Sequence, residues 1–275
     1  MSEPNDIIVG ENLRLNNELK ELRARVAAFE SSRWWRLHPR FMLARLRVRV
    51  SRKQNKALAA PSGHTPTTDE VDALTRRFQD EVLARGNFTQ DWFTMHIPTW
   101  EPLVRELEGR RSRILELGSF EGLSACFVLW RLPDAHVTCI DTFSGLPEHP
   151  AYGIETSRLE DVFDDNVALL DGSRVRKLRG TTRSVLPDLV DGGETFDLVY
   201  VDASHRVLDV LVDAALSWRL LAPSGIAIFD DYGSVPLGKD PMHHPTPAID
   251  AFLEVVAREV EIVDDRRQLV ARKTV

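Results

Sequence analysis

The stretch from residue 113 to residue 141 most strongly constrains how this chain can fold. It begins with a short apolar run at 114–117, long enough for one buried strand, and continues through a turn bracketed by Gly118 and Gly122. An apolar segment over 123–130 then has the pattern of a helix. Because glycine lets a ligand approach the backbone closely, strand, turn and helix together predict a nucleotide-binding corner of an α/β sheet.

The second strand of this corner restricts which nucleotide can bind. An apolar run over 137–140 ends in Asp141, about 20 residues after the turn, where a carboxylate can accept hydrogen bonds from ribose hydroxyls. A dinucleotide-binding turn needs a glycine where this chain has Glu116, whose anion would face the diphosphate. Glu116 instead suits a ligand with an ammonium and a sulfonium, so we expect S-adenosylmethionine. The alternative is that Gly118 and Gly122 only form a tight turn in another kind of α/β protein.

Apolar runs that alternate with helical patterns continue along the chain and predict the fold class. Repeated β-α units form a mostly parallel sheet covered by helices on both faces, with ligands at the carboxyl ends of the strands. We expect an α/β fold with a Rossmann-like seven-stranded, mostly parallel sheet and an N-terminal helical or coiled-coil extension. The predicted strands lie at 113–117, 136–141, 174–178, 197–202, 224–230, 261–263 and 268–272, and the predicted helices at 68–84, 92–107, 123–130, 157–170, 183–189, 206–221 and 247–260.

Charge and composition divide the chain into four segments. Residues 31–68 carry nine basic and no acidic side chains, whereas the whole chain has a formal net charge of −7. We expect a coiled-coil segment at 1–30 and a basic amphipathic segment at 31–60. A linker rich in proline and small polar residues follows at 61–68, and a catalytic domain occupies 69–275.

The first segment has the seven-residue spacing of a coiled coil, including an asparagine at a core position. Such an asparagine typically fixes the register and the number of strands. We expect a short parallel coiled coil that makes the protein a homo-oligomer; the alternative is a single amphipathic helix packed on the body. The spaced positions are Ile8, Asn12, Leu15, Leu19, Leu22, Val26 and Phe29.

The basic segment interleaves tryptophan, leucine and arginine over residues 33–53. This pattern is typical of amphipathic elements that lie at an anionic membrane interface, so we expect peripheral membrane contact there. We expect no nucleic-acid binding, because no recognition motif accompanies the positive charge. The alternative is that the aromatic side chains pack on the protein while the arginines remain solvated.

Cysteine usage and hydropathy predict the compartment. Cys126 and Cys139 both lie in predicted buried elements, which disfavours a disulfide scaffold and favours a reducing environment. No apolar run approaches the roughly 18 residues needed to cross a bilayer, and residues 1–6 do not resemble a signal peptide. We therefore expect a cytoplasmic protein.

Acidic side chains follow two predicted strands at the points where these strands end. Asp202 follows the fourth strand, and Asp230 and Asp231 follow the fifth. Three carboxylates close together repel one another unless a divalent cation binds, and all-oxygen ligation suits Mg²⁺ or Mn²⁺. His205, three residues beyond Asp202, is placed to accept a proton from a substrate hydroxyl. The alternatives are that the aspartates cap the following helices and that His205 is a surface histidine.

The glycine turn and the acidic strand ends resemble the class I S-adenosylmethionine-dependent methyltransferases, and within them the metal-dependent O-methyltransferases. Residues 115–124 match the glycine-rich motif of catechol O-methyltransferase, and residues 180–189 match the family's segment after the third strand. The resemblance implies a cation held by Asp202, Asp230 and Asp231, with Asp202 also at the cofactor. The other implied cofactor-binding residues are Glu116, Gly118, Ser119, Phe120, Gly122, Ser124, Asp141, Thr142, Thr182 and Arg183.

The chain departs from the catechol enzymes at two positions. His205 stands where that family has a lysine base, and Asp231 stands where it has an asparagine ligand. The doubled aspartate is more similar to the macrocin-type sugar O-methyltransferases. Residues 88–272 also resemble a bacterial methyltransferase group that shares the Asp-x-Ser-His sequence at 202–205.

The resemblance implies an O-methyltransferase that acts on a sugar or glycan hydroxyl, with His205 and Asp202 as the catalytic residues. Two alternatives remain: a phenolic or other small hydroxyl acceptor, and a non-catalytic assembly protein that binds the cofactor. Loops rich in proline and glycine, at 143–153 and 233–245, are expected to face the acceptor. The sequence assigns no role to the histidines in these loops, which are His149, His243 and His244.

Overall fold

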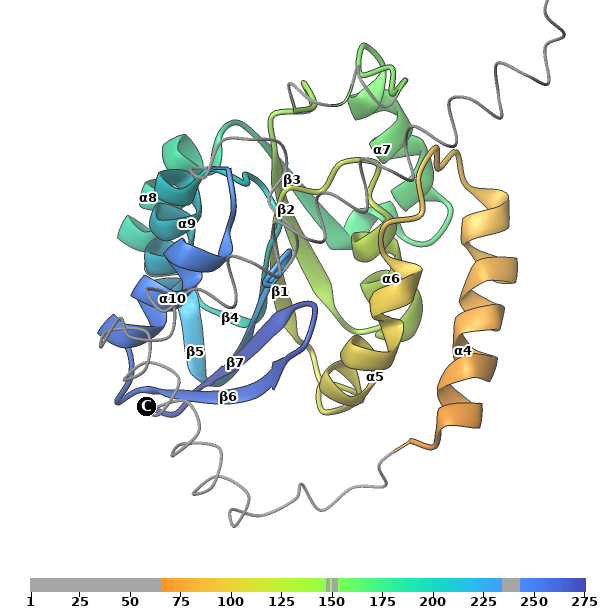
Figure 1. Cartoon of the computed structure of the whole chain (residues 1–275). Helices are drawn as coiled ribbons and strands as arrows, with labels where there is room; N and C mark the ends of the chain where they lie inside the picture. The colour runs from red at the N-terminus through yellow and green to blue at the C-terminus, as the bar shows by residue number, and fades with distance from the viewer. Residues whose placement is uncertain (1–65, 147–148, 150–152, 234–242) are drawn as a thin grey trace, which may run out of the picture. The chain divides into compact units, whose positions relative to one another are not determined.

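The structure is a computed structural model that describes residues 66–146, 149, 153–233 and 243–275. The predicted coiled-coil segment, the basic segment and most of the predicted linker lie outside these residues, so their structures and their roles in assembly or membrane contact stay predictions. The described body is an α/β fold with one sheet between two layers of helices (Figure 1). The predicted fold class is confirmed.

One seven-stranded sheet forms the centre of the body, in the order β3-β2-β1-β4-β5-β7-β6. The first five strands run parallel, and β7 runs antiparallel to both β5 and β6. The chain order reverses at β1, whose neighbours are β2 and β4, and ligands bind in this kind of fold at such a switch point. The strands are β1 (Arg113–Leu117), β2 (His136–Asp141), β3 (Val175–Arg179), β4 (Phe196–Val201), β5 (Leu221–Phe229), β6 (Val260–Asp265) and β7 (Leu269–Lys273).

Helices cover both faces of the sheet, as Figure 1 shows. Alternate residues of one strand enter different cores: Ile114 packs into the core under α4 to α7, and Leu115 packs into the core under α8 to α10. This alternation follows from the two-residue period of a strand, and it explains why the central strands are almost continuously apolar. The helices are α4 (Thr68–Glu81), α5 (Ile97–Arg105), α6 (Leu123–Arg131), α7 (Leu159–Ala168), α8 (Thr182–Asp191), α9 (Val207–Leu220) and α10 (Thr246–Val255).

Local sequence explains where some of these helices begin and end. Thr67 and Glu70 form a capping box at the start of α4, in which each side chain bonds the other residue's backbone N–H. The predicted last helix is too long: α10 ends at Val255, and Val260 already belongs to β6. Val256 is the C-cap of α10, and residues 256–259 form a turn that leads into β6. Among the helices that the structure describes, none is long and apolar enough to cross a membrane.

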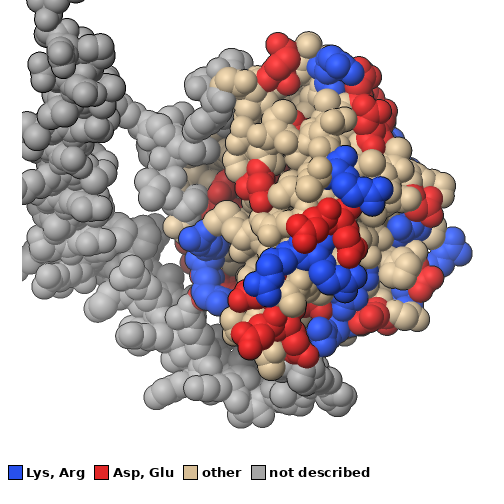
Figure 2. All heavy atoms as spheres, turned by 90° about the vertical axis from the view of Figure 1, so that its right-hand side faces the viewer, with Lys and Arg blue, Asp and Glu red and all other residues tan. Residues whose placement is uncertain are grey.

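Acidic and basic side chains are interspersed over the face of the body that carries α4 and α7 (Figure 2). A more buried ion pair joins α5 to α6, where the Arg131 guanidinium donates to both carboxylate oxygens of Glu101 at 2.9 and 3.0 Å. Cys126 and Cys139 are buried and free, as the sequence predicted.

Candidate active site

The carboxyl ends of β1, β2, β4 and β5 border one cleft with a volume of about 890 Å³. A volume of this size is typical of a site for a ligand as large as a cofactor. Ten of the residues predicted from the sequence line it: Gly118, Phe120, Asp141, Thr142, Thr182, Arg183, Asp202, His205, Asp230 and Asp231. The fold therefore brings the predicted cofactor turn and the predicted acidic site into a single cleft.

The glycine turn has a backbone that only glycine adopts readily. Gly118 has a φ of +83°, and a Cβ atom there would lie 2.1 Å from the carbonyl oxygen of Asp202. Gly122 also has a φ of +83°, and a Cβ atom there would lie 2.9 Å from the ring of Phe163. Phe120, between them, has a φ of +47°, a conformation that is strained for a non-glycine residue and is common at functional sites.

Asp141 holds this turn through its carboxylate. One oxygen accepts hydrogen bonds from the backbone N–H groups of Ser119 and Phe120, at 2.8 and 2.9 Å, and the other accepts from Phe143 at 2.7 Å. A carboxylate has about four acceptor positions, so these contacts leave about one for a further donor. Asp141 lines the cleft, so that donor can be a ribose hydroxyl.

Four predicted cofactor residues lie behind the cleft surface and do not line it. They are Glu116, Ser119, Gly122 and Ser124, all of them buried. The Ser124 hydroxyl donates a hydrogen bond to Glu116, and the Cys139 thiol donates to the other oxygen at 3.4 Å. Burial raises the pKa of Glu116 above its ordinary value. Direct contact of these four residues with a cofactor stays a prediction.

The loop after β3 supplies another part of the cleft. The Thr181 side chain accepts a hydrogen bond from the Ser184 backbone N–H at 3.2 Å and so caps the start of α8. This cap places Thr182 and Arg183 in the first turn of α8, at the cleft surface. Gly180 and Thr181 also line the cleft, although the sequence singled out only the two residues after them.

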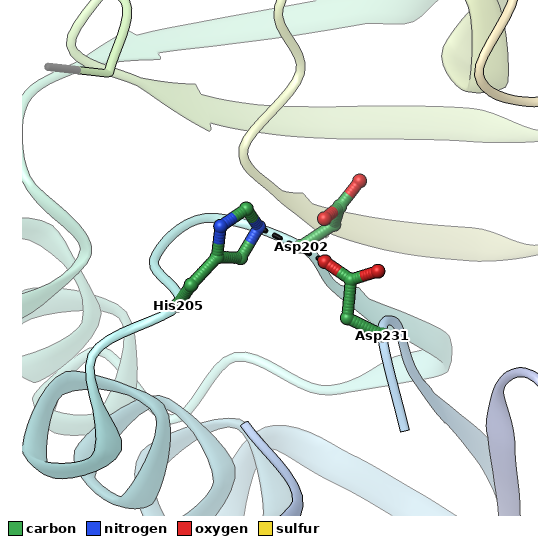
Figure 3. A group of neighbouring side chains, drawn as sticks. All are labelled: Asp202, His205 and Asp231. Carbon is green, nitrogen blue, oxygen red and sulfur yellow. Dashed lines mark ion pairs between the residues drawn. The ribbon is translucent and has the colours of Figure 1, made fainter. Parts of the chain in front are cut away.

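Asp202, His205 and Asp231 form a compact group at the acidic end of the cleft (Figure 3). One possible ligand atom from each lies within 4.8 Å of the others, and the His205 Nε2 atom is 3.1 Å from a carboxylate oxygen of Asp231. Burial, and then the charges of Asp230 and Asp231, raise the pKa of Asp202 well above its usual range. The hydrogen bond with His205 lowers the pKa of Asp231.

Asp230 lines the same cleft but does not belong to this group of three. One of its oxygens accepts a hydrogen bond from the Gln268 side-chain amide at 2.8 Å and lies 3.9 Å from the Nε2 atom of His96. None of the three aspartates caps a helix in the described part of the chain, because the N-cap residues of α9 and α10 are Arg206 and Pro245. The capping alternative is therefore wrong, and a role in the cleft remains.

The sequence missed a group of cleft-lining residues that lie before the first strand in the chain. These residues are Gln90, Trp92, Met95 and His96. Trp92 stacks on Phe120 with 5.2 Å between ring centroids, and His149 packs edge-on against Phe120 at 5.1 Å. Their only signal in the sequence was the apolar and aromatic content of the stretch before the first strand, which also fits an ordinary core helix.

The loop histidines lie near the cleft in different surroundings. His149 is buried, and its Nδ1 atom accepts a hydrogen bond from the Leu146 backbone at 3.2 Å. The ring centroid of His243 is 5.9 Å from that of His205. The His244 Nδ1 atom accepts from the Thr246 backbone at 3.2 Å, which places it at the start of α10.

Comparisons with known proteins agree with this geometry. The sequence model of a family described as a methyltransferase domain matches residues 115–232. O-methyltransferase hkm8 of Aspergillus hancockii is 30% identical over 165 residues, which cover 59% of this chain and 56% of that protein.

Two solved structures are similar to this chain, and the likeness of the first shows the fold. The MycE methyltransferase of the mycinamycin biosynthetic pathway, in complex with Mg, SAH and mycinamycin VI, superposes with a TM-score of 0.50 at 16% identity, covering 74% of this chain and 54% of that one. The O-methyltransferase TomG from Streptomyces achromogenes, in complex with SAM, has a TM-score of 0.49 at 21% identity, covering 76% and 92%. The chain spans little more than half the length of hkm8 and of MycE.

Residues 115–232 are thus similar to a methyltransferase domain. The strand order of the sheet and its glycine turn agree with the Rossmann-like fold of the class I S-adenosylmethionine-dependent methyltransferases.

Proposed function

We propose that the protein transfers the methyl group of S-adenosylmethionine to a hydroxyl oxygen, with a divalent cation at the acceptor and a sugar or glycan as the acceptor. The observation that carries this proposal is the single cleft, which has the cofactor turn at one end and four predicted acidic or imidazole side chains at the other. The name of the relative that is 30% identical, an O-methyltransferase, supports oxygen as the methyl acceptor.

The chain's own groups fit the cofactor. Gly118 keeps the turn open to a ligand, and Asp141 retains an acceptor position for the ribose. Thr182 and Arg183 line the cleft at the amino end of α8, which supports the proposal that they contact the adenine. The bound cofactor would supply an electrophilic methyl group on its sulfonium, and the protein would orient that group toward the acceptor oxygen.

The acidic end fits a hard divalent cation. Asp202 and Asp231 offer carboxylate oxygens beside the His205 imidazole, and Asp230 follows Phe229 at the end of the adjacent strand. Carboxylates with water suit Mg²⁺ or Mn²⁺, and the mutual repulsion that raises the pKa of Asp202 would be relieved by a cation. A cation held there would bind the acceptor hydroxyl and lower its pKa.

His205 has two roles open to it in this site. We propose that it accepts the proton of the acceptor hydroxyl, as general base. Its Nε2 atom lies 3.1 Å from Asp231, so this contact must open before that nitrogen can accept a proton. In the other role, the same nitrogen would be a ligand to the cation, because His205 belongs to the compact group.

The acceptor would lie against the wall formed by Trp92 and Met95, whose side chains are exposed beside the cleft. The face of a sugar ring packs well on an indole, which favours a sugar or glycan. A phenol would pack on the same wall, so a phenolic or other small hydroxyl compound remains the second candidate. A non-catalytic assembly protein is the third, and it would have no need for the acidic group beside the cofactor.

Calorimetry with S-adenosylhomocysteine, with and without Mg²⁺, tests the two binding sites separately. Incubation with labelled S-adenosylmethionine and matched panels of glycans and phenols then tests the acceptor. We expect cofactor binding, Mg²⁺-dependent labelling of a glycan, and loss of labelling in Asp231→Asn but not in the exposed control Asp188→Asn. Tight cofactor binding without a divalent-cation effect on labelling would refute the cation, and labelling of phenols alone would refute the glycan.

A further inference from the structure

Two buried side chains hold the acidic strand ends from behind the cleft. The Tyr200 hydroxyl donates a hydrogen bond to one oxygen of Asp202 at 3.0 Å, and the Gln268 amide donates to one oxygen of Asp230 at 2.8 Å. Tyr200 and Gln268 are 3% and 2% exposed, so neither donor has water as a substitute partner. Each contact occupies one oxygen and leaves the other oxygen of its aspartate for the cleft.

The register of the sheet explains why Gln268 reaches Asp230. Phe229, the last residue of β5, pairs with Leu269, the first residue of the antiparallel β7. Asp230 follows Phe229 and Gln268 precedes Leu269, so the two residues lie side by side at this end of the sheet. The partner of Asp230 therefore comes from the terminal hairpin.

Trp100 fixes both donors. Its indole N–H donates to the Gln268 carbonyl oxygen at 2.9 Å, and its ring meets the Tyr200 ring edge-on at 4.9 Å between centroids. An indole can only donate, so the Gln268 amide must present its oxygen to Trp100 and its NH₂ group to Asp230. Trp100 is itself 1% exposed and packs against Phe93 and Phe127 on the α5 side of the sheet.

We infer that Gln268 and Tyr200 are positioning residues for the cation, and that Trp100 sets the orientation of both. Each donor fixes the plane of one aspartate carboxylate. It bonds one carboxylate oxygen and leaves the other oxygen directed to the cleft. Partners of this kind around a metal site typically change metal affinity about 10–100-fold when they are removed. The inference rests on the cation site of the proposed function.

Mn²⁺ binding to the full-length protein, followed by electron paramagnetic resonance, tests the inference without an acceptor or turnover. We expect Gln268→Leu and Tyr200→Phe each to raise the Kd for Mn²⁺ about tenfold or more, and Trp100→Phe to raise it by a similar factor. Trp218→Phe is the matched control, because Trp218 is also buried and its indole N–H has no hydrogen-bond partner among the described residues. The control should leave the Kd within twofold of the wild-type value.

A second measurement separates positioning from loss of fold. The affinity for S-adenosylhomocysteine should stay unchanged in Gln268→Leu, because Gln268 does not line the cleft. If Gln268→Leu does not fold, Tyr200→Phe decides the question, since it removes one oxygen atom and leaves the ring packing in place. Variants that bind Mn²⁺ as tightly as the wild type would overturn the inference while the proposed function stands. A wild-type protein that binds no Mn²⁺ would remove the cation site and this inference together, leaving cofactor binding unaffected.

Discussion

Asp213 lies inside α9 at 1% exposure, and neither of its carboxylate oxygens has a hydrogen-bond partner among the described residues. Burial raises its pKa from 3.8 to about 6, an effect that the nearby Thr182 side chain partly offsets and the charge of Asp209 increases. A carboxyl whose pKa is higher in the folded than in the unfolded state destabilises the protein as pH rises. The cost begins near pH 3.8, where the unfolded chain ionises, and is complete above pH 6.

The size of the effect follows from the difference between the two pKa values. It corresponds to about 3 kcal/mol of unfolding free energy at pH 8 and to about half of that at pH 5. Asp213→Asn keeps the shape of the side chain and removes the titration. The variant should therefore gain more stability at pH 8 than at pH 5, and the difference between the two gains should be about 1.5 kcal/mol.

Urea unfolding of both proteins at pH 5 and pH 8 measures this difference directly. A buried amide without partners has its own cost, but that cost does not depend on pH and cancels in the comparison. Asp188→Asn, on the exposed surface of α8, is the matched control and should show the same small effect at both pH values. An equal change for Asp213→Asn at pH 5 and pH 8 would show that the carboxyl ionises freely in the folded protein, and the reasoning from burial would fail.

Four further predictions concern the site and the N-terminal segment. Asp141→Ala should weaken S-adenosylhomocysteine binding about tenfold or more in calorimetry, because it removes both the ribose partner and the anchor of the turn; an unchanged Kd in a folded variant would contradict this. EDTA should abolish methyl transfer, and added Mg²⁺ or Mn²⁺ should restore it. His205→Ala should lower kcat about 10²–10⁴-fold with little change in cofactor affinity, and full activity of this variant would move the base to Asp202. Deleting residues 1–30 should reduce the mass measured by light scattering, and a full-length monomer at micromolar concentration would refute the coiled coil.

The sequence predicted the central sheet well because its signals were local. A short strand at 113–117 with three apolar side chains, a glycine turn and an acid at the end of the next strand are features that one sheet geometry produces. The end of α10 was less predictable, because residues 256–259 continue the helical pattern but form a turn before β6. Neither glycine nor proline marks this helix end in the sequence.

Within the site, the residues that follow a strand end could be predicted, and those that arrive from elsewhere in the chain could not. Asp202 and Asp230 were placed because parallel strands end at one edge of the sheet. His96 and Gln268 reach the same edge from a short helix before the sheet and from the terminal hairpin, and neither belongs to a recognisable motif. Which of the aspartates gather around His205 depends on side-chain contacts, which residue spacing does not determine.

The close contact between Gly118 and the Asp202 carbonyl oxygen makes the two ends of the cleft parts of one backbone unit. A side chain at position 118 would have to displace the end of β4, and Asp202 would move with it. We therefore expect that the glycine turn and the acidic end of this cleft cannot be exchanged independently of each other. A designer who transplants the glycine turn from another methyltransferase must transplant the start of the loop after β4 as well.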